Sequence, residues 1–256
     1  MDIQRLKYLL LISLIVCFLL GFFFLKASSL EFKQTKLNTG IISLSFDDGY
    51  SSHYNFAYPL MKKYGFKGTE YLVANWSGKF ENKTLINFDE ARKMQSDGWE
   101  IGSHSLNHPN LVALSINKLN EELKLSKEIL INNEFNISSI AFPYGYYNKN
   151  VSSLIRNYYS SARPLINGYN IDKTQNLYEL KSKWVVKDSN FVEVCNWVKY
   201  AKLNNLWLIL VFHNIEDSPT EYWSVSTEGF QEVLKCINES KIEVKTITEA
   251  INEKRN

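Results

Sequence analysis

This chain of 256 residues contains few cysteines and few histidines, and neither positive nor negative charge is in large excess. Three cysteines are too few for a disulfide framework, and Cys195 and Cys236 fall in helical patterns where we expect buried free thiols. A bridge between these two is an open alternative for a protein outside the cytoplasm. The 29 Lys and Arg residues are balanced by 27 Asp and Glu residues, so no basic stripe for nucleic acid is expected.

Two further absences narrow the fold class. No internal repeat is visible, and no glycine-rich phosphate loop follows the first expected strand, which argues against a doubly wound dinucleotide-binding sheet. The length suits one large domain. Strand-like and helix-like segments alternate from Gly40 onward, which predicts an α/β fold, namely a distorted (β/α) barrel of seven or eight mainly parallel strands.

The N-terminal residues do not share this alternation. Leu9 to Leu25 is an uncharged apolar run preceded by basic residues, so residues 1–25 are expected to be a membrane anchor or, alternatively, a signal peptide. The basic residues ahead of the run predict an extracytoplasmic domain, anchored at its N-terminus or else secreted. Residues 26–39 are then a linker, and residues 40–256 a single folded domain.

Apolar periodicity and turn residues predict the individual elements. Helices are expected over residues 52–64, 87–97, 115–131, 150–157, 190–203, 227–238 and 248–254. Strands are expected over residues 40–44, 66–73, 99–103, 139–142, 159–162, 177–186, 206–212 and 242–247. Asn87 with Glu90 predicts a capping box, and Ser115 predicts a second helix cap.

Polar residues cluster just after several of these strands. Asp47 and Asp48 follow the first, His104 and His108 another, and His213 the strand over residues 206–212. The carboxyl ends of parallel barrel strands meet at one face, where barrel enzymes assemble their active sites. Three of the four histidines therefore fall at one rim.

Simpler interpretations exist for each residue alone. Asp47-Asp48-Gly49 is a typical turn, and His213 at the end of an apolar strand suits a core histidine. His53 is expected on the surface of a helix. The shared location at one rim favours the functional interpretation of the other histidines and of the aspartate pair.

His104 and His108 are four residues apart, a spacing that places both imidazoles on one side of a helical turn. Because Pro109 follows, we expect a single turn rather than a long helix. One aspartate completes a set of two imidazoles and a carboxylate, which leaves positions open as a catalytic Zn²⁺ requires. The same set suits Co²⁺, Ni²⁺ or Fe²⁺.

Ser45-Phe46-Asp47-Asp48-Gly49, His104-Ser105-Leu106-Asn107-His108-Pro109, Pro143-Tyr144-Gly145 and a late strand ending in His213 occur in this order. The pattern resembles the polysaccharide deacetylases of the NodB-homology class, carbohydrate esterase family four, over residues 40 to 250. The resemblance implies metal-dependent removal of N-acetyl groups from N-acetylglucosamine units of peptidoglycan, chitin or an exopolysaccharide.

The same resemblance implies a role for each matching residue. Asp48, His104 and His108 would bind the metal, and Asp47 would be the general base. His213 would be the general acid that protonates the departing amine. The backbone N–H of Tyr144 would stabilise the oxyanion, with Pro143 and Gly145 setting its position against the substrate.

Two departures from the family pattern stand out. The usual arginine two residues before Pro143 is replaced by Ala141, and we expect Arg163 to supply the guanidinium that orients Asp47. The usual Asp-x-x-Asp-Trp motif is also absent. Trp184 lies in the corresponding region as a candidate substrate contact, with Asp188 the nearest acid, so the sequence does not show what holds His213.

These departures keep other functions open. An esterase that removes O-acetyl groups from xylan or another polysaccharide needs the same metal and acids. Ala141 and the missing Asp-x-x-Asp-Trp motif suggest a carbohydrate-binding relative that has lost catalysis. A metal-free hydrolase is expected to lack one of the ligands. The expected partners are an N-acetylated polysaccharide and, through the N-terminal run, a membrane; we expect no nucleic acid and a monomer.

Overall fold

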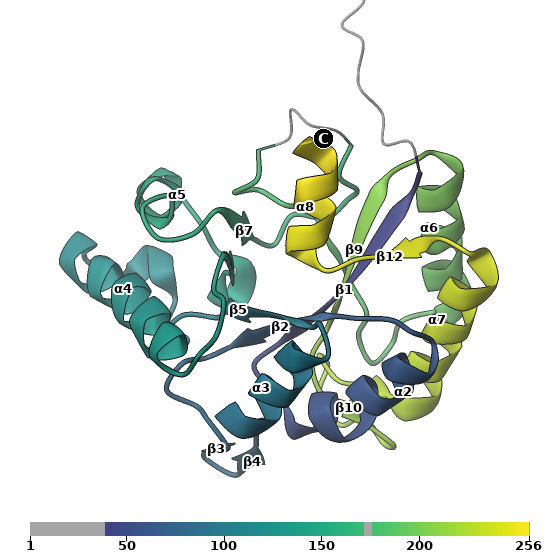
Figure 1. Ribbon diagram of the computed structural model, residues 1–256, viewed down its shortest axis with the longest axis horizontal. Coiled ribbons are helices and arrows are strands. Elements are labelled where there is room, and N and C mark those ends of the chain that lie inside the picture. Colours follow the sequence, from purple (N-terminus) through teal and green to yellow (C-terminus); the bar gives the residue numbers. More distant parts are fainter. Residues whose placement is uncertain (1–38, 172–175, 256) are drawn as a thin grey trace, which may run out of the picture. The chain divides into compact units, whose positions relative to one another are not determined.

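The computed structural model describes residues 39–171 and 176–255. Its main sheet is a half-barrel of parallel strands, in agreement with the expected distorted barrel (Figure 1). In sheet order the strands are β7 (Ser161–Arg163), β6 (Ser139–Ala141), β5 (Glu100–Ser103), β2 (Thr69–Leu72), β1 (Ile41–Asp47), β9 (Trp207–Phe212) and β8 (Lys183–Trp184). The short β12 (Glu243–Val244) also pairs with the start of β1.

The edge strands β7 and β8 do not pair with each other. The backbone between them bridges part of the opening, because Ala162 next exchanges hydrogen bonds with Leu177 and Leu180, and Ser182 bonds to Ile166. The strand expected over residues 177–186 is therefore mostly loop. Only Lys183 and Trp184 pair in register with β9.

Helices cover the sheet in the expected order. They are α2 (Tyr58–Lys63), α3 (Phe88–Ser96), α4 (Ile116–Asn132), α5 (Lys149–Ile155), α6 (Phe191–Leu203), α7 (Thr227–Ser240) and α8 (Ile247–Arg255). A π-helical turn, η1 (His53–Ala57), precedes α2, and short 3₁₀ turns occupy η2 (Leu111–Ala113) and η3 (Pro143–Gly145). Two small pairs complete the elements: β3 (Lys79–Phe80) with β4 (Lys83–Thr84), and β10 (Ile215–Glu216) with β11 (Val225–Ser226).

Local sequence explains where two of these helices begin. The Asn87 side chain accepts from the backbone of Glu90 while Glu90 accepts from the backbone of Asn87, so the predicted capping box is confirmed. Ser115 caps α4, also as predicted.

The strands β1 and β9 are buried along their whole length. Phe46, Phe212 and Phe230 form one aromatic cluster between the sheet and the helices, whereas Ile41, Trp207 and Ile209 belong to a separate apolar cluster. Burial on both faces is typical of a parallel sheet and explains the continuous apolar run of β9. It also fixes the strand ends, from which the polar residues emerge.

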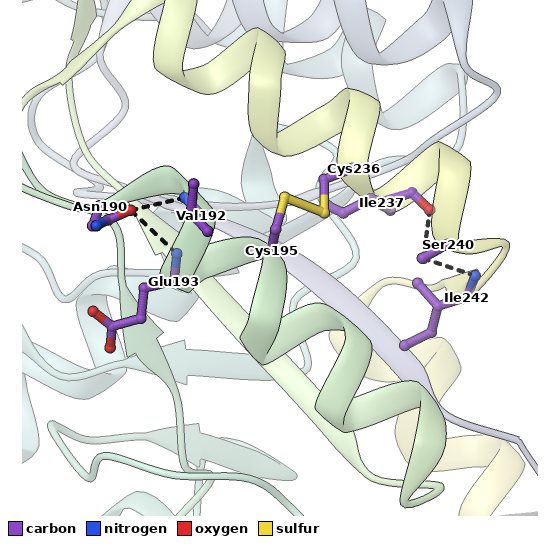
Figure 2. The surroundings of a disulfide bond; sticks show 8 residues. All are labelled: Asn190, Val192, Glu193, Cys195, Cys236, Ile237, Ser240 and Ile242. Atoms are coloured by element: carbon purple, nitrogen blue, oxygen red, sulfur yellow. Dashed lines mark hydrogen bonds between the residues drawn. A yellow bond between two sulfur atoms is a disulfide. The ribbon is translucent and has the colours of Figure 1, made fainter.

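The helices α6 and α7 are joined by a disulfide between Cys195 and Cys236, whose Cα atoms are 5.9 Å apart (Figure 2). The expectation of free thiols was therefore wrong. The two cysteines are 41 residues apart in sequence, and only the packing of α6 against α7 brings them together.

The expected anchor or signal peptide over residues 1–25 lies outside the described residues, as does the expected linker up to residue 38. Within the described part of the chain, no helix has both the length and the apolar character needed to cross a bilayer.

Candidate functional site

The predicted polar residues lie together at the carboxyl ends of the strands. Asp47 is the last residue of β1, Arg163 is the last residue of β7, and His104 and His213 directly follow β5 and β9. They share one cavity of about 290 Å³. Its wall consists of Asp47, Asp48, His104, His108, Phe142, Tyr144, Gly145, Tyr146, Arg163, Leu165, Trp184, His213 and Trp223.

Asp48, His104 and His108 can present one ligand atom each within 4.8 Å of one another. The Nε2 atoms of His104 and His108 lie 3.5 and 3.3 Å from Asp48 Oδ1. This oxygen is buried and has no hydrogen-bond partner among the described residues. A buried carboxylate oxygen that faces two imidazole nitrogens and has no hydrogen-bond donor is suited to a divalent cation, so the geometry of these three residues fits a metal site.

Burial lowers the pKa of His108 to about 4, and the neighbouring His104 adds to the effect despite the opposing charges of Asp48 and Asp47. The imidazole of His108 is therefore neutral near pH 7. Only a neutral imidazole can donate a lone pair to a metal, so this protonation state suits a ligand.

The backbone at His104–His108 is not the expected helical turn. Ser105 and His108 have positive φ angles of 70° and 57°, so the segment is a tight irregular loop. Hydrogen bonds to side chains fix it: Ser105 N donates to Ser103 Oγ, and His108 N donates to Ser105 Oγ. The two imidazoles converge because of this loop geometry and not because of helical spacing.

A buried carboxylate from α4 supports the same loop. Glu122 accepts from the backbone N–H groups of Leu106 and Asn107 and from the Asn107 side chain, over 2.7–3.2 Å. This contact was not predictable from the sequence, because Glu122 lies in the middle of an amphipathic helix where a solvated glutamate is the ordinary expectation.

His104 is oriented from behind. Its Nδ1 lies 2.9 Å from the carbonyl oxygen of Ala141, and a carbonyl can only accept, so Nδ1 carries the proton. Nε2 is then the lone-pair nitrogen that faces Asp48. This second contact is the kind that orients histidine ligands in metal sites.

Asp47 makes different contacts from its neighbour Asp48. Its Oδ1 and Oδ2 lie 2.5 and 2.6 Å from Nη2 of Arg163. Burial alone would raise the pKa of Asp47, but the charge of Arg163, with those of His104 and His213, outweighs burial and lowers this pKa to about 2. Asp47 is therefore an ionised and nearly inaccessible carboxylate at neutral pH.

His213 lies on the other side of Asp47, with Nε2 3.9 Å from Asp47 Oδ2. Its ring is 18% exposed and packs beside Trp223, with the ring centroids 5.4 Å apart. Burial lowers the pKa of His213, although Asp47 and Asp48 oppose that effect. Nδ1 of His213 has no hydrogen-bond partner among the described residues.

The predicted substrate contacts divide between the wall and the layer beneath it. Tyr144, Gly145 and Trp184 line the cavity, whereas Pro143 is buried below it. Gly145 has a φ of +70°, and a Cβ there would lie 2.1 Å from the Cβ of Leu165, so glycine is required. Leu165 and Phe142 are wall residues that the sequence did not indicate.

His53 is not a surface residue. It is fully buried beneath the site, with Nδ1 against the carboxylate of Glu70 and Nε2 against the carbonyl oxygen of His213. Helical periodicity placed it outward because a lone histidine on a helix gives no sign of a buried partner. Glu70, a carboxylate in the middle of an expected strand, was the available signal.

Taken together, the cavity contains three side chains that could hold a cation, an ionised carboxylate and an imidazole around one accessible space. Such a site can activate water, accept its proton and protonate a leaving group. This chemistry hydrolyses an amide or an ester.

Comparison with known proteins agrees with this chemistry. A family model described as polysaccharide deacetylase matches residues 34–160. The Bacillus subtilis (strain 168) protein named "Putative polysaccharide deacetylase YxkH" is 31% identical over 126 residues, which are 48% of this chain and 44% of that protein. The poly-beta-1,6-N-acetyl-D-glucosamine N-deacetylase of Staphylococcus aureus (strain MRSA252) is 28% identical over 136 residues, which are 48% of this chain and 47% of that protein.

The chain thus spans about half the length of these curated relatives. Among solved structures, BA3943 of Bacillus anthracis, described as a CE4 family pseudoenzyme, superposes with a TM-score of 0.59 at 18% identity. The match covers 84% of this chain and 66% of that one. It shows the fold alone, and because that protein is described as a pseudoenzyme, activity must be argued from the side chains in the cavity.

Proposed function

Since the chain belongs to the polysaccharide deacetylase family, we propose that it is a metal-dependent hydrolase that removes N-acetyl groups from an N-acetylglucosamine-containing polysaccharide. One observation carries the proposal. The buried, unpartnered Oδ1 of Asp48 faces the Nε2 atoms of His104 and His108, directly beside a carboxylate that Arg163 holds ionised. The intact set argues against a relative that has lost catalysis.

Asp48, His104 and His108 would hold Zn²⁺, or alternatively Co²⁺, Ni²⁺ or Fe²⁺, since all accept imidazole and carboxylate ligands. When bound, such an ion polarises the acetyl carbonyl and lowers the pKa of water. The proton transfers are carried out by side chains of the protein.

Asp47 is the general base. Its two oxygens both lie within 2.6 Å of Arg163, which fixes the carboxylate and keeps it ionised. Asp47 takes a proton from the water as the water attacks the acetyl carbon. Arg163 thereby performs from β7 the task for which the family pattern has an arginine at the position of Ala141.

His213 is the general acid. The C–N bond of a tetrahedral intermediate breaks only if the nitrogen receives a proton, because an amide anion is a very poor leaving group. His213 Nε2 faces the same space as Asp47 and is partly exposed to it. The proton that Asp47 takes from water can pass through His213 to the departing amine. Asp47 and His213 are then in their starting protonation states for the next cycle.

The cavity wall positions the acetamide. We assign the backbone N–H of Tyr144 to the oxyanion, with Pro143 beneath and Gly145 beside it to fix its place. Trp184 and Trp223 offer apolar faces for a methyl group and a sugar ring. The staphylococcal relative, which is named for a polymer of N-acetyl-D-glucosamine, supports this substrate class.

We also place the domain outside the cytoplasm. Disulfides persist in oxidising compartments, and Cys195 is bonded to Cys236. The apolar run Leu9 to Leu25 and its preceding basic residues support an N-terminal anchor, with secretion as the alternative.

The test is acetate release by the full chain loaded with Zn²⁺, measured on β-1,6-linked and β-1,4-linked N-acetylglucosamine oligomers and on acetylated xylan. We expect the wild type to release acetate from at least one of the N-acetylglucosamine oligomers and the Asp47→Asn variant to release none. Release from xylan alone would replace the proposal by an O-acetyl esterase. Oligomer binding without acetate release would replace it by a non-catalytic carbohydrate-binding protein.

A further inference from the structure

A polar pair is buried between the sheet and the first helical segment, outside the cavity. His53 belongs to η1 and Glu70 to β2, and both side chains are 0% exposed. Their nearest contacts are 3.0 Å and 3.1 Å, from His53 Nδ1 to the two carboxylate oxygens of Glu70. A fully buried pair of this kind is expensive to desolvate, so it calls for a reason beyond stability.

The other ring nitrogen of His53, Nε2, contacts the backbone of His213, the proposed general acid. His53 Nε2 lies 2.8 Å from the carbonyl oxygen of His213. Because a carbonyl can only accept, Nε2 must carry a proton. Nδ1 then either donates to ionised Glu70 or accepts from protonated Glu70, and in both states the bond to His213 is kept.

His213 has little else to hold it. Its Nδ1 has no hydrogen-bond partner among the described residues, and its Nε2 is 3.9 Å from Asp47. The ring is therefore placed mainly by its own backbone and by packing against Trp223. The anchoring of that backbone decides where the imidazole lies.

A neighbouring residue strengthens the same anchor. Ser52 Oγ donates to Asn214 Oδ1 and accepts from the backbone N–H of Ile215. The two residues Ser52 and His53, just after β1, thus hold three successive residues after β9. These contacts connect the backbone around His213, the proposed general acid, to the segment that follows β1, the strand that ends at Asp47.

We propose that Glu70 and His53 are a positioning pair for His213, fixing its main chain so that its imidazole faces Asp47. The role rests on the proposed deacetylase function, in which His213 is the general acid. Glu70 orients the His53 ring, and His53 orients the carbonyl. Burial raises the pKa of Glu70 to about 7, outweighing the opposing effect of His53, which agrees with a pair that shares one proton.

The test replaces both members at once, because removing one would leave the other buried without a partner. In the full chain, His53→Phe with Glu70→Leu substitutes apolar groups in a cluster that already contains Phe46 and Tyr50. We expect a folded protein with unchanged Zn²⁺ content and KM but a kcat lower by about 10- to 100-fold on the N-acetylglucosamine oligomer. Glu70→Gln alone should keep most of the kcat, since its amide can donate to His53 Nδ1.

A second measurement of the positioning role does not depend on enzymatic turnover. With four histidines in the chain, the imidazole signals of the Zn²⁺-loaded protein can be assigned by NMR, and the double variant should shift and broaden that of His213. The matched control is Glu100→Gln, at the start of β5, whose carboxylate accepts from Ser139 and Thr248. This control should leave the His213 signal and kcat in place.

The outcomes separate the two proposals. Wild-type kcat together with an unmoved His213 signal in the double variant would overturn the positioning role and reduce the pair to a core contact. A wild-type chain that releases no acetate, but whose His213 signal still depends on the pair, would support the positioning and overturn the deacetylase function.

Discussion

Asp47 and Asp48 are neighbours in the chain, yet their carboxylates have different partners. Asp47 faces Arg163 and His213, whereas Asp48 Oδ1 faces two imidazoles and no donor. Regular strand geometry would point the two side chains to opposite faces, but Asp48 directly follows β1 with a φ angle of 73°, and both carboxylates line the same cavity. One dipeptide can therefore supply both a base and a metal ligand.

Removal of Arg163 should show what keeps Asp47 ionised. In Arg163→Ala, burial would no longer be opposed by the guanidinium, so the pKa of Asp47 rises from about 2. The base must be ionised to act, and the acid limb of the kcat profile should therefore move to higher pH. We expect a loss of kcat on the order of 100-fold.

The measurement is a pH–rate profile for acetate release, with Arg163→Lys as the conservative control that restores a positive charge. Wild-type turnover in the alanine variant would show that Arg163 has no part in orienting Asp47.

Replacement of His213 should depend on the leaving group. An amine must be protonated as it departs, but a nitrophenolate departs without help. His213→Ala should therefore lose about 100-fold or more of kcat on an N-acetylglucosamine oligomer and much less on 4-nitrophenyl acetate. Equal losses on both substrates would argue against His213 as the acid.

At the scale of elements, the loop that carries His104 and His108 depends on α4. Glu122 holds two backbone N–H groups of this loop and one side chain. Glu122→Ala should release the loop and weaken Zn²⁺ binding by about 10- to 100-fold, as expected for a residue behind a metal ligand.

A competition titration between the full chain and a chelator measures this change in affinity. Glu121→Ala is the matched control, because Glu121 is the preceding residue on the same helix and is exposed. Equal Zn²⁺ affinity in the two variants would show that Glu122 does not contribute to Zn²⁺ binding.

The disulfide between α6 and α7 acts on stability. Closing a loop of 41 residues stabilises a fold by about 4 kcal/mol in the chain-entropy estimate. The double variant Cys195→Ala with Cys236→Ala should lower Tm measurably in calorimetry and leave kcat at 25 °C unchanged, since neither residue lines the cavity. An unchanged Tm would mean that the bond contributes nothing to folding.

At the scale of the whole molecule, the sequence predicted the features that repeat locally. Alternating apolar segments predicted the order of strands and helices, and the positions of Asp47, His104 and His213 after strands predicted a common rim. These inferences succeed because the carboxyl ends of parallel strands meet wherever the sheet forms.

Features that depend on distant partners were not predictable from local patterns. His53 meets Glu70, Cys195 meets Cys236 and Glu122 meets Asn107 only after helices dock on the sheet. Periodicity describes one element at a time and carries no information about its neighbour. Arg163 was an exception, because the missing arginine at Ala141 indicated that a guanidinium was needed.

The central claim is that a divalent metal held by Asp48, His104 and His108 is required for deacetylation. Metal content and acetate release, measured together on the purified full chain and on its Asp48→Ala variant, test this claim most directly. We predict one Zn²⁺ equivalent and acetate release for the wild type, and loss of both in the variant. Full metal content with wild-type acetate release in Asp48→Ala would contradict the account.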